Sequence, residues 1–368
     1  MPIQNAIPSE FKKTMLEVYK QDAKQAKIGF LSNLFETRPE WNVDTEKVSL
    51  DIVKSSKKIA PVVTGLGGSA VEVSSSIFEG MEVAAPVYKL KNTVDIFNLL
   101  QREPGETEWS NARVSWAVKV ANKIRDKKSD HTSMITRSLE KQAAELLQNG
   151  TITLTDENGN DAYTLNFQKD AKQMVTPAVK WDASGASIEK DISALAEELS
   201  EQGFTATILI FGSDAWSAFM KDDNIKELVF RDKFDMGAFT NERRDKGEVY
   251  KGRITLGDFD FYLYTYNASY EEFASKNKVR YLDRKNVLML PDEADMDFRL
   301  VQTVYPQLGS KSRFANLVPE EAVINKIRFY NKIWDNEETD ATYLQTAARP
   351  LCLPASLDCW GVLKNVCN

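Results

Sequence analysis

"ARVSWAVKVANKIRDKKSDHTSMITRSLEKQAAELLQ", residues 112–148, is the longest uniform stretch of the chain. No glycine or proline occurs between Gly105 and Gly150, and helix-forming residues predominate. Apolar residues recur at helical spacing in its second half: Ile135, Leu139, Ala143, Leu146 and Leu147. The pattern predicts a helix of about 35 residues, roughly 50 Å long, with Gly150 as its C-terminal cap. Such a helix is longer than a compact globule normally needs.

The same stretch holds a candidate break and a concentration of positive charge. Near "KKSDHTS", Ser129 or Asp130 could cap a second helix, so an interrupted helix is the alternative. We interpret the charge as a solvated helix face, with contact to a polyanion or an acidic partner as the competing interpretation. The only histidine, His131, is expected at an exposed helix position. Residues 113–128 contain one acid, Asp126, and six basic residues: Arg113, Lys119, Lys123, Arg125, Lys127 and Lys128.

A hairpin is predicted directly after the helix, in "TITLTDENGNDAYTLNF", residues 151–167. Two strand-like runs flank Asn158–Gly159, a dipeptide typical of tight β-turns. The acidic turn lacks the ligand spacing and the terminal glutamate of a calcium-binding loop. We therefore interpret it as a turn and not as a metal site.

From residue 183 onward the pattern becomes mixed α/β. Apolar residues at helical spacing over 188–199 predict an amphipathic helix closed by Gly203. "TATILIF", residues 205–211, predicts a buried strand, and Ser213 or Asp214 is expected to cap the helix that follows.

Three further segments predict strands. "GDFDFYLYTYNASY", residues 257–270, alternates apolar and polar side chains, which is typical of a two-faced strand. "NVLMLP" predicts a short buried strand ended by Pro291, and the tail has two apolar runs separated by Pro354.

Upstream of the long helix, "VSLDIVKSSKKIAPVV", residues 48–63, predicts strands with a turn at Ser55–Lys58. It runs into "PVVTGLGGSAVEVSSSIFEGMEVAAPVY", residues 61–88, where Gly65, Gly67 and Ala70 have the spacing G-x-G-x-x-A of a dinucleotide-binding turn. That turn must open a helix whose N-terminus holds the pyrophosphate. The β-branched residues and serines after Ala70 are poor material for a first helical turn. The glycines therefore indicate a flexible, extended loop.

Composition restricts the class of protein. The 368 residues are 42% hydrophobic and 27% charged, as in ordinary soluble domains. A net charge of −7 argues against general affinity for nucleic acid. No apolar stretch is long enough to span a membrane, and the first residues lack the pattern of a signal peptide, so we expect the protein to remain where it is made.

No residue cluster predicts catalysis, a cofactor or a metal site. The three cysteines, Cys352, Cys359 and Cys367, lack a nearby fourth ligand and fit a reducing compartment as plain thiols. One histidine leaves little scope for acid–base chemistry. A solvated loop is the interpretation of the acidic cluster Asp292, Glu293, Asp295 and Asp297. We therefore expect no enzyme.

Six segments in order resemble the major capsid protein of tailed phages, the Hong Kong 97-type fold, and most closely the lambda-like capsid protein E family. Together they cover about residues 45–366, and the first 40 residues match least. They are "VSLDIVKSSKKIAPVVTGLGG", "AAELLQNGTITLTDENG" with "LNFQKDA", "WDASGASIEKDI", "ILIFGSDAWSAFMKD", "GDFDFYLYTYNASY" and "YLQTAARPLCLPASLDCWGVLKNV".

The resemblance implies an α+β fold in five segments. They are an N-terminal arm (1–47), strands and an extended β loop (48–95), a peripheral domain with the long spine helix (96–182), an axial domain (183–340) and C-terminal strands that return to the core (341–368).

The resemblance also implies which residues act in assembly. The extended loop would reach over a neighbouring subunit, and about 15 residues out and 15 back span roughly 50 Å at most. The candidate loop residues are Gly65, Gly67, Gly68, Val71, Val73, Ile77, Phe78 and Gly80. The candidate core of the axial domain is Trp216, Phe211 and Phe261.

The implied function is self-assembly into hexamers and pentamers that form an icosahedral head shell around phage DNA. The implied partners are further copies of the chain, a scaffolding protein, a portal, a decoration protein and the packaged DNA at the inner face, without a membrane. The protein would be assembled in the host cytoplasm and reside in the virion. The alternatives are an encapsulin-like shell and, from the glycine spacing alone, a nucleotide-binding oxidoreductase.

Overall fold

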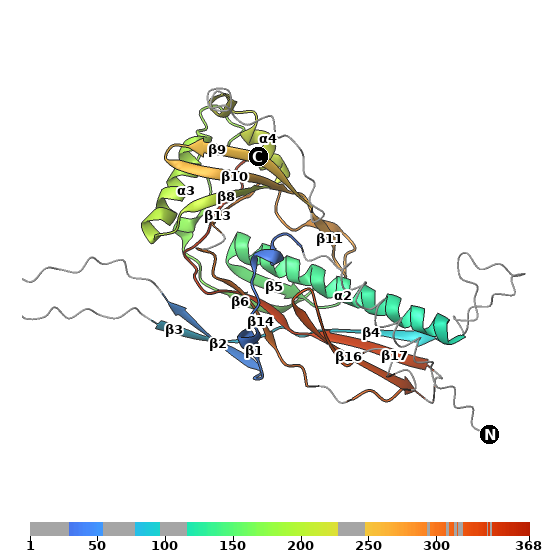
Figure 1. Ribbon diagram of the computed structural model, residues 1–368. Coiled ribbons are helices and arrows are strands. Elements are labelled where there is room, and N and C mark those ends of the chain that lie inside the picture. The colour runs from blue at the N-terminus through green and yellow to red at the C-terminus, as the bar shows by residue number, and fades with distance from the viewer. Residues whose placement is uncertain are drawn as a thin grey trace, which may run out of the picture.

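A computed structural model describes residues 29–53, 78–95, 116–226, 247–292, 295–306, 309–312, 315, 319–336, 338 and 341–368. A long helix lies along one sheet, a second α/β unit lies at one end of that helix, and a two-stranded ribbon projects from the body (Figure 1). The architecture is the expected α+β class. The turn at Ser55–Lys58 and the glycines at 65, 67 and 68 lie outside the described residues.

The long helix, α2 (Trp116–Asn149), is continuous over 34 residues, as predicted. Gly150 follows with φ +66° and donates its N–H to the carbonyl of Leu146 at 2.8 Å, which makes it the expected C-terminal cap. The alternative of a break near Ser129 is wrong. The hydroxyls of Thr132 and Thr136 donate to carbonyls one turn earlier, at 2.9 and 2.8 Å, and so are satisfied inside the helix.

The sheet beside α2 is antiparallel, in the order β15-β16-β17-β4. Its strands are β4 (Tyr88–Asp95), β15 (Glu321–Ile324), β16 (Ile327–Asn336) and β17 (Ala341–Ala348). Val120 and Ile124 of α2 belong to one buried cluster with Val94, Ile333 and Leu344 of this sheet. The helix and the sheet therefore stabilise each other by burying apolar surface.

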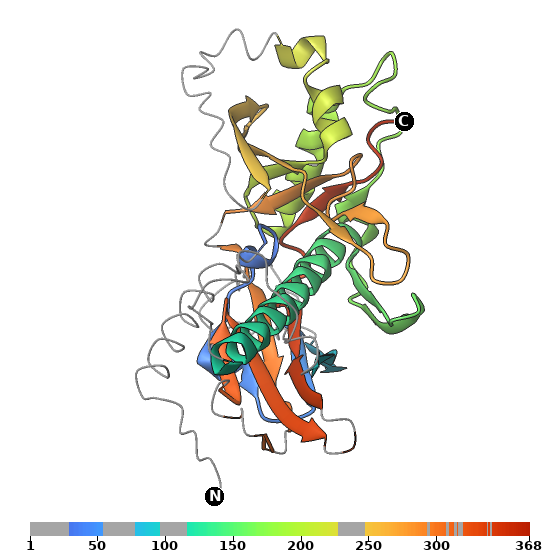
Figure 2. The same cartoon turned by 90° about the vertical axis from the view of Figure 1, so that its right-hand side faces the viewer.

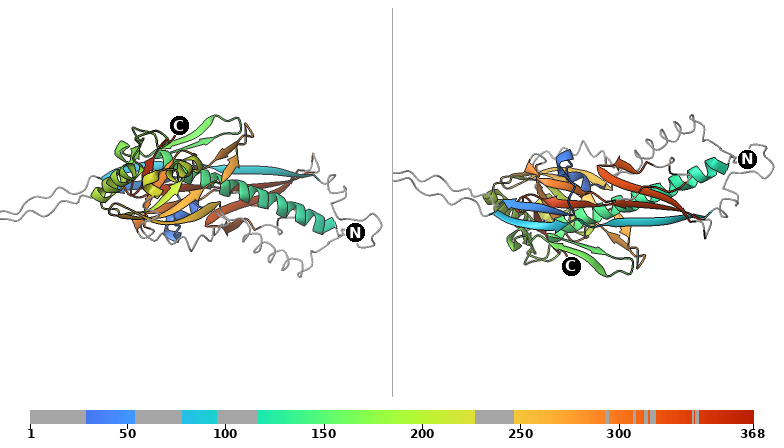
Figure 3. Two further views of the ribbon diagram at one scale, coloured as in Figure 1. Left: turned by 90° about the horizontal axis from the view of Figure 1, so that it is seen from above. Right: turned by 90° about the horizontal axis from the view of Figure 1, so that it is seen from below.

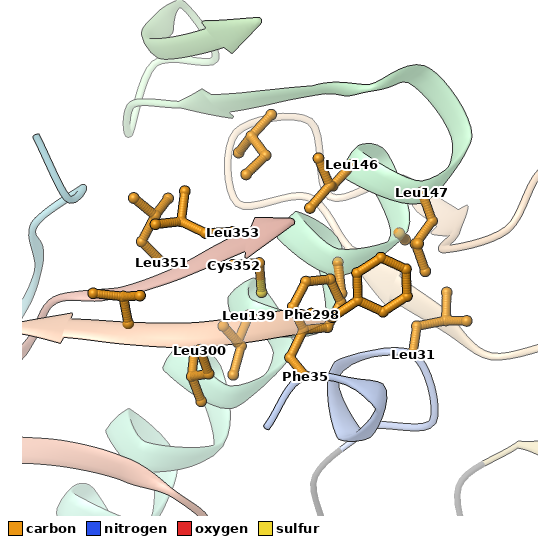
Figure 4. Close-up of a cluster of buried hydrophobic side chains, with 14 of the residues drawn as sticks. Leu31, Phe35, Leu139, Leu146, Leu147, Phe298, Leu300, Leu351, Cys352 and Leu353 are labelled. Carbon is orange, nitrogen blue, oxygen red and sulfur yellow. The ribbon is translucent and has the colours of Figure 1, made fainter. Parts of the chain in front are cut away.

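A small sheet, β1-β14-β18, closes the central core. It contains β1 (Asn42–Val43), β14 (Phe298–Thr303) and β18 (Pro350–Pro354), and the 3₁₀ helices η1 (Ser32–Leu34) and η2 (Pro39–Trp41) lead into it. Figure 4 shows apolar side chains of β14, of β18 and of the residues on either side of η1 gathered around the second half of α2, which contributes Leu139, Leu146 and Leu147. This cluster holds the N-terminal segment, the helix and the C-terminal strands together.

The second unit is a six-stranded mixed sheet in the order β7-β19-β13-β8-β10-β9 (Figure 2). The strands are β7 (Met174–Val175), β8 (Ala206–Phe211), β9 (Glu248–Leu256), β10 (Phe259–Tyr266), β13 (Val287–Pro291) and β19 (Gly361–Leu363). The predicted strands at 205–211, 257–270 and 286–291 are therefore confirmed.

Two helices pack on this sheet. The first, α3 (Ile188–Gln202), ends at Gly203, which has φ +91°, as predicted. The second, α4 (Ser213–Phe219), begins differently from the prediction, because Gly212 is its N-cap and neither Ser213 nor Asp214 caps it through a side chain. The carbonyl of Arg284 instead accepts from the N–H groups of residues 214 and 215, at 3.0 and 2.9 Å. A neighbouring loop thus replaces the side-chain cap.

Two hairpins extend from the body. The predicted hairpin is β5 (Thr151–Thr155) with β6 (Asp161–Asn166), and Gly159 in its turn has φ +87°. The Asp156 carboxylate accepts from the N–H groups of residues 158 and 160, which fixes the turn. The other hairpin is β11 (Ser269–Glu271) with β12 (Lys278–Arg280).

Strand pairing connects the segment expected at 183–340 with the rest of the chain. Within that segment, β14 pairs with β1 and β18, and β15 and β16 lie in one sheet with β17 and β4. The six-stranded sheet takes in β7 and β19 from outside the segment. Composition did not indicate these pairings, because the partner strands are far apart in sequence.

Candidate functional site

The candidate assembly element is the ribbon formed by β2 (Lys47–Val53) and β3 (Phe78–Ala84). The strands pair antiparallel in continuous register, and β2 and β3 pair only with each other among the described strands. In Figure 1 the ribbon extends from the unit around α2, and in the view from below it lies at the end of the body that carries α3 (Figure 3). Of the candidate loop residues, Phe78 and Gly80 lie in β3, opposite Val53 and Asp51. Gly65, Gly67, Gly68, Val71, Val73 and Ile77 lie outside the described residues.

The base of the ribbon is part of the central core. Val48, Val83 and Ala85 are buried and belong to the cluster around α2. Lys47 and Glu82 form an ion pair of 3.3 Å across the strands, but both are largely exposed, so this pair adds little stability. The ribbon is therefore held by apolar burial at one end.

Glu140 of α2 joins three segments that are distant in sequence. Its carboxylate accepts hydrogen bonds from the backbone N–H groups of Leu31 and Ser32, at 2.9 and 2.8 Å, and from the hydroxyl of Tyr266 at 2.6 Å. The residue is 2% exposed. Hydrogen bonds to a buried charged group are among the stronger ones in proteins. We call Glu140 and these three donors the Glu140 joint.

The surroundings of the joint suit a carboxylate. Burial, followed by the charge of Glu140, raises the pKa of Tyr266, so its hydroxyl stays protonated and donates. A Cβ atom at Gly29 would lie 2.0 Å from Oε2 of Glu140. Only glycine therefore lets the N-terminal segment approach α2 this closely.

The C-terminal end of α2 is bound to the second unit. The Gln148 side-chain amide donates to the carbonyl of Tyr281 at 2.8 Å, and its oxygen accepts from the N–H of Asp283 at 2.9 Å. The indole N–H of Trp360 donates to the carbonyl of Leu147 at 3.0 Å. These bonds connect α2 to the loop before β13 and to the C-terminal strands.

Lys169 is buried beside Trp360. Its ammonium donates to the carbonyls of Leu357 and Trp360, both at 2.7 Å, and lies 3.5 Å from the centroid of the Trp360 ring system. Burial lowers the pKa of Lys169 to about 7. Gly150 passes close by, and a Cβ there would meet Cβ of Lys169 at 2.7 Å.

The candidate core residues lie on the six-stranded sheet and α4. Phe211 and Phe261 are fully buried, whereas Trp216 is only partly buried. Trp216 stacks on Phe219 with ring centroids 5.6 Å apart and meets Phe211 edge-on at 5.4 Å. It thus covers the core of this unit from one side.

Replacing Trp216 by alanine should lower the free energy of unfolding by about 3 kcal/mol, at the lower end of the range for aromatic residues because its ring is only partly buried. Chemical denaturation measures this. Tyr262→Ala, at an exposed position of the same sheet, is the control and should change little. An unchanged unfolding free energy for Trp216→Ala would show that the aromatic cluster does not depend on it.

The basic run of α2 is not a uniformly solvated face. Lys128 is only 4% exposed, and burial lowers its pKa to about 7. The expectation of an exposed His131 is wrong, because this residue is 2% exposed and its Nδ1 lies 3.1 Å from the hydroxyl of Thr346 in β17. Burial lowers the pKa of His131, so the neutral form is favoured. His131 faces the neighbouring sheet because α2 packs against it.

Among the described residues, neither the acidic cluster nor the cysteines form a group that could hold a metal ion. Asp297 binds the Arg299 guanidinium through both oxygens, at 2.9 Å each. All three cysteines are buried and unpaired, and burial raises the pKa of each thiol, that of Cys359 to about 12. No group of three metal-ligating side chains occurs in the described part of the chain. Likewise, none of the described helices is long and apolar enough to cross a membrane.

The Glu140 joint was missed in the sequence, although a signal for it exists. Thr136, Glu140, Ala143 and Leu147 share one helical face, so an acidic residue falls within the apolar stripe of α2. An acid at such a position must be buried and hydrogen-bonded. Its donors could not be identified, because they lie more than 100 residues away.

Comparisons with solved structures identify the fold. A protein assigned as a prophage capsid protein of Escherichia coli CFT073 superposes with a TM-score of 0.59 at 16% identity, covering 95% of this chain and 98% of that one. A phage-related protein from Bordetella bronchiseptica RB50 gives 0.49 at 10% identity, covering 95% and 97%. The SrpI encapsulin from Synechococcus elongatus PCC 7942 gives 0.43 at 12% identity, covering 91% and 86%. The fold assignment depends on the first of these.

No curated protein sequence matches the chain significantly. The family model described as phage major capsid protein E matches residues 16–364, which is nearly the entire chain. This match includes the ribbon, α2, the four-stranded sheet beside it, the small three-stranded sheet and the six-stranded sheet. The chain therefore belongs to the phage major capsid protein E family.

Proposed function

We propose that copies of this major capsid protein assemble into an icosahedral phage head. Hexamers and pentamers of the chain build it, and phage DNA is packaged inside. A net charge of −7 suits such a container, because a strongly cationic lining would bind the genome tightly. A single heterologous contact repeated around closed rings produces both ring sizes.

The observation that carries the proposal is the β2–β3 ribbon. A two-stranded ribbon that leaves the body is only marginally stable by itself in water. Its edges pair with no described strand of this chain, and its base is fixed in the core. Contact with a neighbouring subunit would cover the unpaired edges, while the buried base holds the ribbon to its own subunit. The loop between the two strands would reach over that neighbour.

The further partners are a scaffolding protein, a portal, a decoration protein and the packaged DNA at the inner face. Assembly would take place in the host cytoplasm, and the mature protein would reside in the virion head. The six-stranded unit would be the axial domain around the five-fold and six-fold axes, and the unit around α2 the peripheral domain. These assignments are supported by family membership.

Negative-stain electron microscopy with light scattering tests the proposal on the purified full chain, with and without the scaffolding protein encoded beside it. Closed shells, or rings of five and six, are expected in at least one condition. Nuclease-resistant DNA in particles from infected cells would identify the content. A stable monomer or dimer in both conditions would overturn the proposal.

Deleting residues 66–80 should leave a folded subunit that cannot close a shell. The buried base at Val48, Val83 and Ala85 lies outside the deletion, so the melting midpoint should change little. Electron microscopy and calorimetry of the same preparation separate the two effects. Normal particles from this variant would contradict the role assigned to the loop.

A further inference from the structure

Arg349 occupies the junction between two sheets at the base of the ribbon. It is the single residue between β17, in the sheet beside α2, and β18, in the small sheet. Its side chain is buried, with 7% of the residue exposed. Buried N–H groups are costly unless they are hydrogen-bonded, and both terminal nitrogens of this guanidinium, Nη1 and Nη2, have acceptors inside the protein.

The guanidinium binds both strands of the ribbon where they leave the body. Nη2 donates to the carbonyl of Glu46, immediately before β2, at 3.3 Å, and to the carbonyl of Ala85, immediately after β3, at 3.2 Å. Nη1 donates to the carbonyl of Val304, immediately after β14, at 3.2 Å. One side chain thus connects the two ends of the ribbon to the body.

These hydrogen bonds restrain the angle at which the ribbon leaves the body, which apolar packing does not. Val48 and Val83 hold the ribbon in the core, but the hydrophobic effect is not directional. A planar guanidinium directs its donors along fixed lines and therefore restrains the angle at which the strands emerge. Seven residues of a strand extend about 23 Å, so a tilt of about 10° at the base would move the far end by about 4 Å.

We propose that Arg349 is the positioning residue that sets the direction of the β2–β3 ribbon, and thereby decides whether copies of the chain close into a uniform shell. The effect on shell closure depends on the proposed function, whereas the effect on the direction of the ribbon does not. Arg349 acts through the ribbon and needs no contact with the neighbouring subunit.

Arg349→Lys and Arg349→Met test the proposal, with Arg299→Lys as the matched control. Lysine keeps the charge but presents one donor centre in place of a planar fork, and methionine removes all donors. Arg299 also uses two guanidinium nitrogens, which donate to its neighbour Asp297, and its guanidinium carbon lies 5.4 Å from the centroid of the Trp41 ring. The control therefore loses a comparable contact without affecting the ribbon.

Two readouts are taken on each variant. In the unassembled full-length subunit, amide hydrogen exchange around 46–48 and 83–85 should become about tenfold faster, the factor that corresponds to one lost hydrogen bond to a charged group, while exchange in α2 stays unchanged. Electron microscopy should show few closed particles of wild-type diameter and more open or irregular ones. The control should match the wild type in both.

The outcomes separate the two proposals. If the wild type forms no shells, the proposed function fails, and the role of Arg349 is decided by hydrogen exchange alone. Unchanged exchange at the ribbon base in both Arg349 variants would overturn the positioning role. So would equally faster exchange throughout the chain, because it would indicate a general loss of stability.

Discussion

Replacing Glu140 by alanine should lower the free energy of unfolding by about 3–5 kcal/mol. A hydrogen bond to a charged group contributes roughly 1.5–3 kcal/mol and three buried donors lose their acceptor together, but removing the carboxylate also removes the cost of burying it. These donors are the N–H groups of Leu31 and Ser32 and the hydroxyl of Tyr266. The N-terminal segment should also detach from α2. Chemical denaturation measures the first effect, and limited proteolysis near residue 30 measures the second.

Two further variants show how much each hydrogen bond of the Glu140 joint contributes to the free energy of unfolding. Glu140→Gln keeps one acceptor oxygen but turns an amide donor toward the remaining donors, so its loss should be intermediate. Tyr266→Phe removes one donor and should cost about 1–2 kcal/mol. Glu157→Ala, at an exposed acid in the β5–β6 turn, is the control. A Glu140→Ala protein as stable as this control would show that the joint contributes nothing.

Replacing Leu139 by proline should prevent the chain from folding. Proline removes a helical hydrogen bond and clashes with the preceding turn, which costs about 3 kcal/mol or more. The substitution also removes a buried leucine, worth a further 2–5 kcal/mol or so, from the cluster in Figure 4 that includes Phe298 and Cys352. Together these losses approach the roughly 5–15 kcal/mol that stabilises a whole domain. Circular dichroism and the soluble fraction measure the result.

Leu139→Ala and Ala117→Pro separate the effect of the lost leucine packing from the effect of a proline in α2. The alanine variant loses only the packing and should remain folded but less stable. Proline at 117 falls in the first turn of α2, where no helical hydrogen bond is lost, and should be tolerated. Normal shells from Leu139→Pro would mean that an unbroken α2 is not required.

The elements that sequence analysis predicted are those determined by local chemistry. The absence of glycine and proline, the spacing of Leu139 and Leu146, and the cap at Gly150 are sufficient to predict α2. The β5–β6 hairpin depends on Asn158–Gly159 in the same way. In each case the residues responsible are only a few positions apart.

The features that sequence analysis did not predict depend on contacts between residues far apart in the sequence. Gly212 caps α4 because the carbonyl of Arg284 lies beside it, and no pattern near Gly212 indicates that. The pairing of β4 with β17 joins segments about 250 residues apart, and no local pattern in either segment indicates its partner. The acceptors of Arg349 are likewise remote, which is why its place at the ribbon base was not predicted.

The buried thiols have a consequence for the life of the particle outside a cell. In air, accessible thiolates become oxidised and can join neighbouring chains by disulfides. The reactive species is the thiolate, and at Cys352, Cys359 and Cys367 burial disfavours that form and restricts the approach of an oxidant. Oxidation at these positions is therefore disfavoured in the folded subunit, and ageing of the particle should not involve covalent cross-linking through the cysteines.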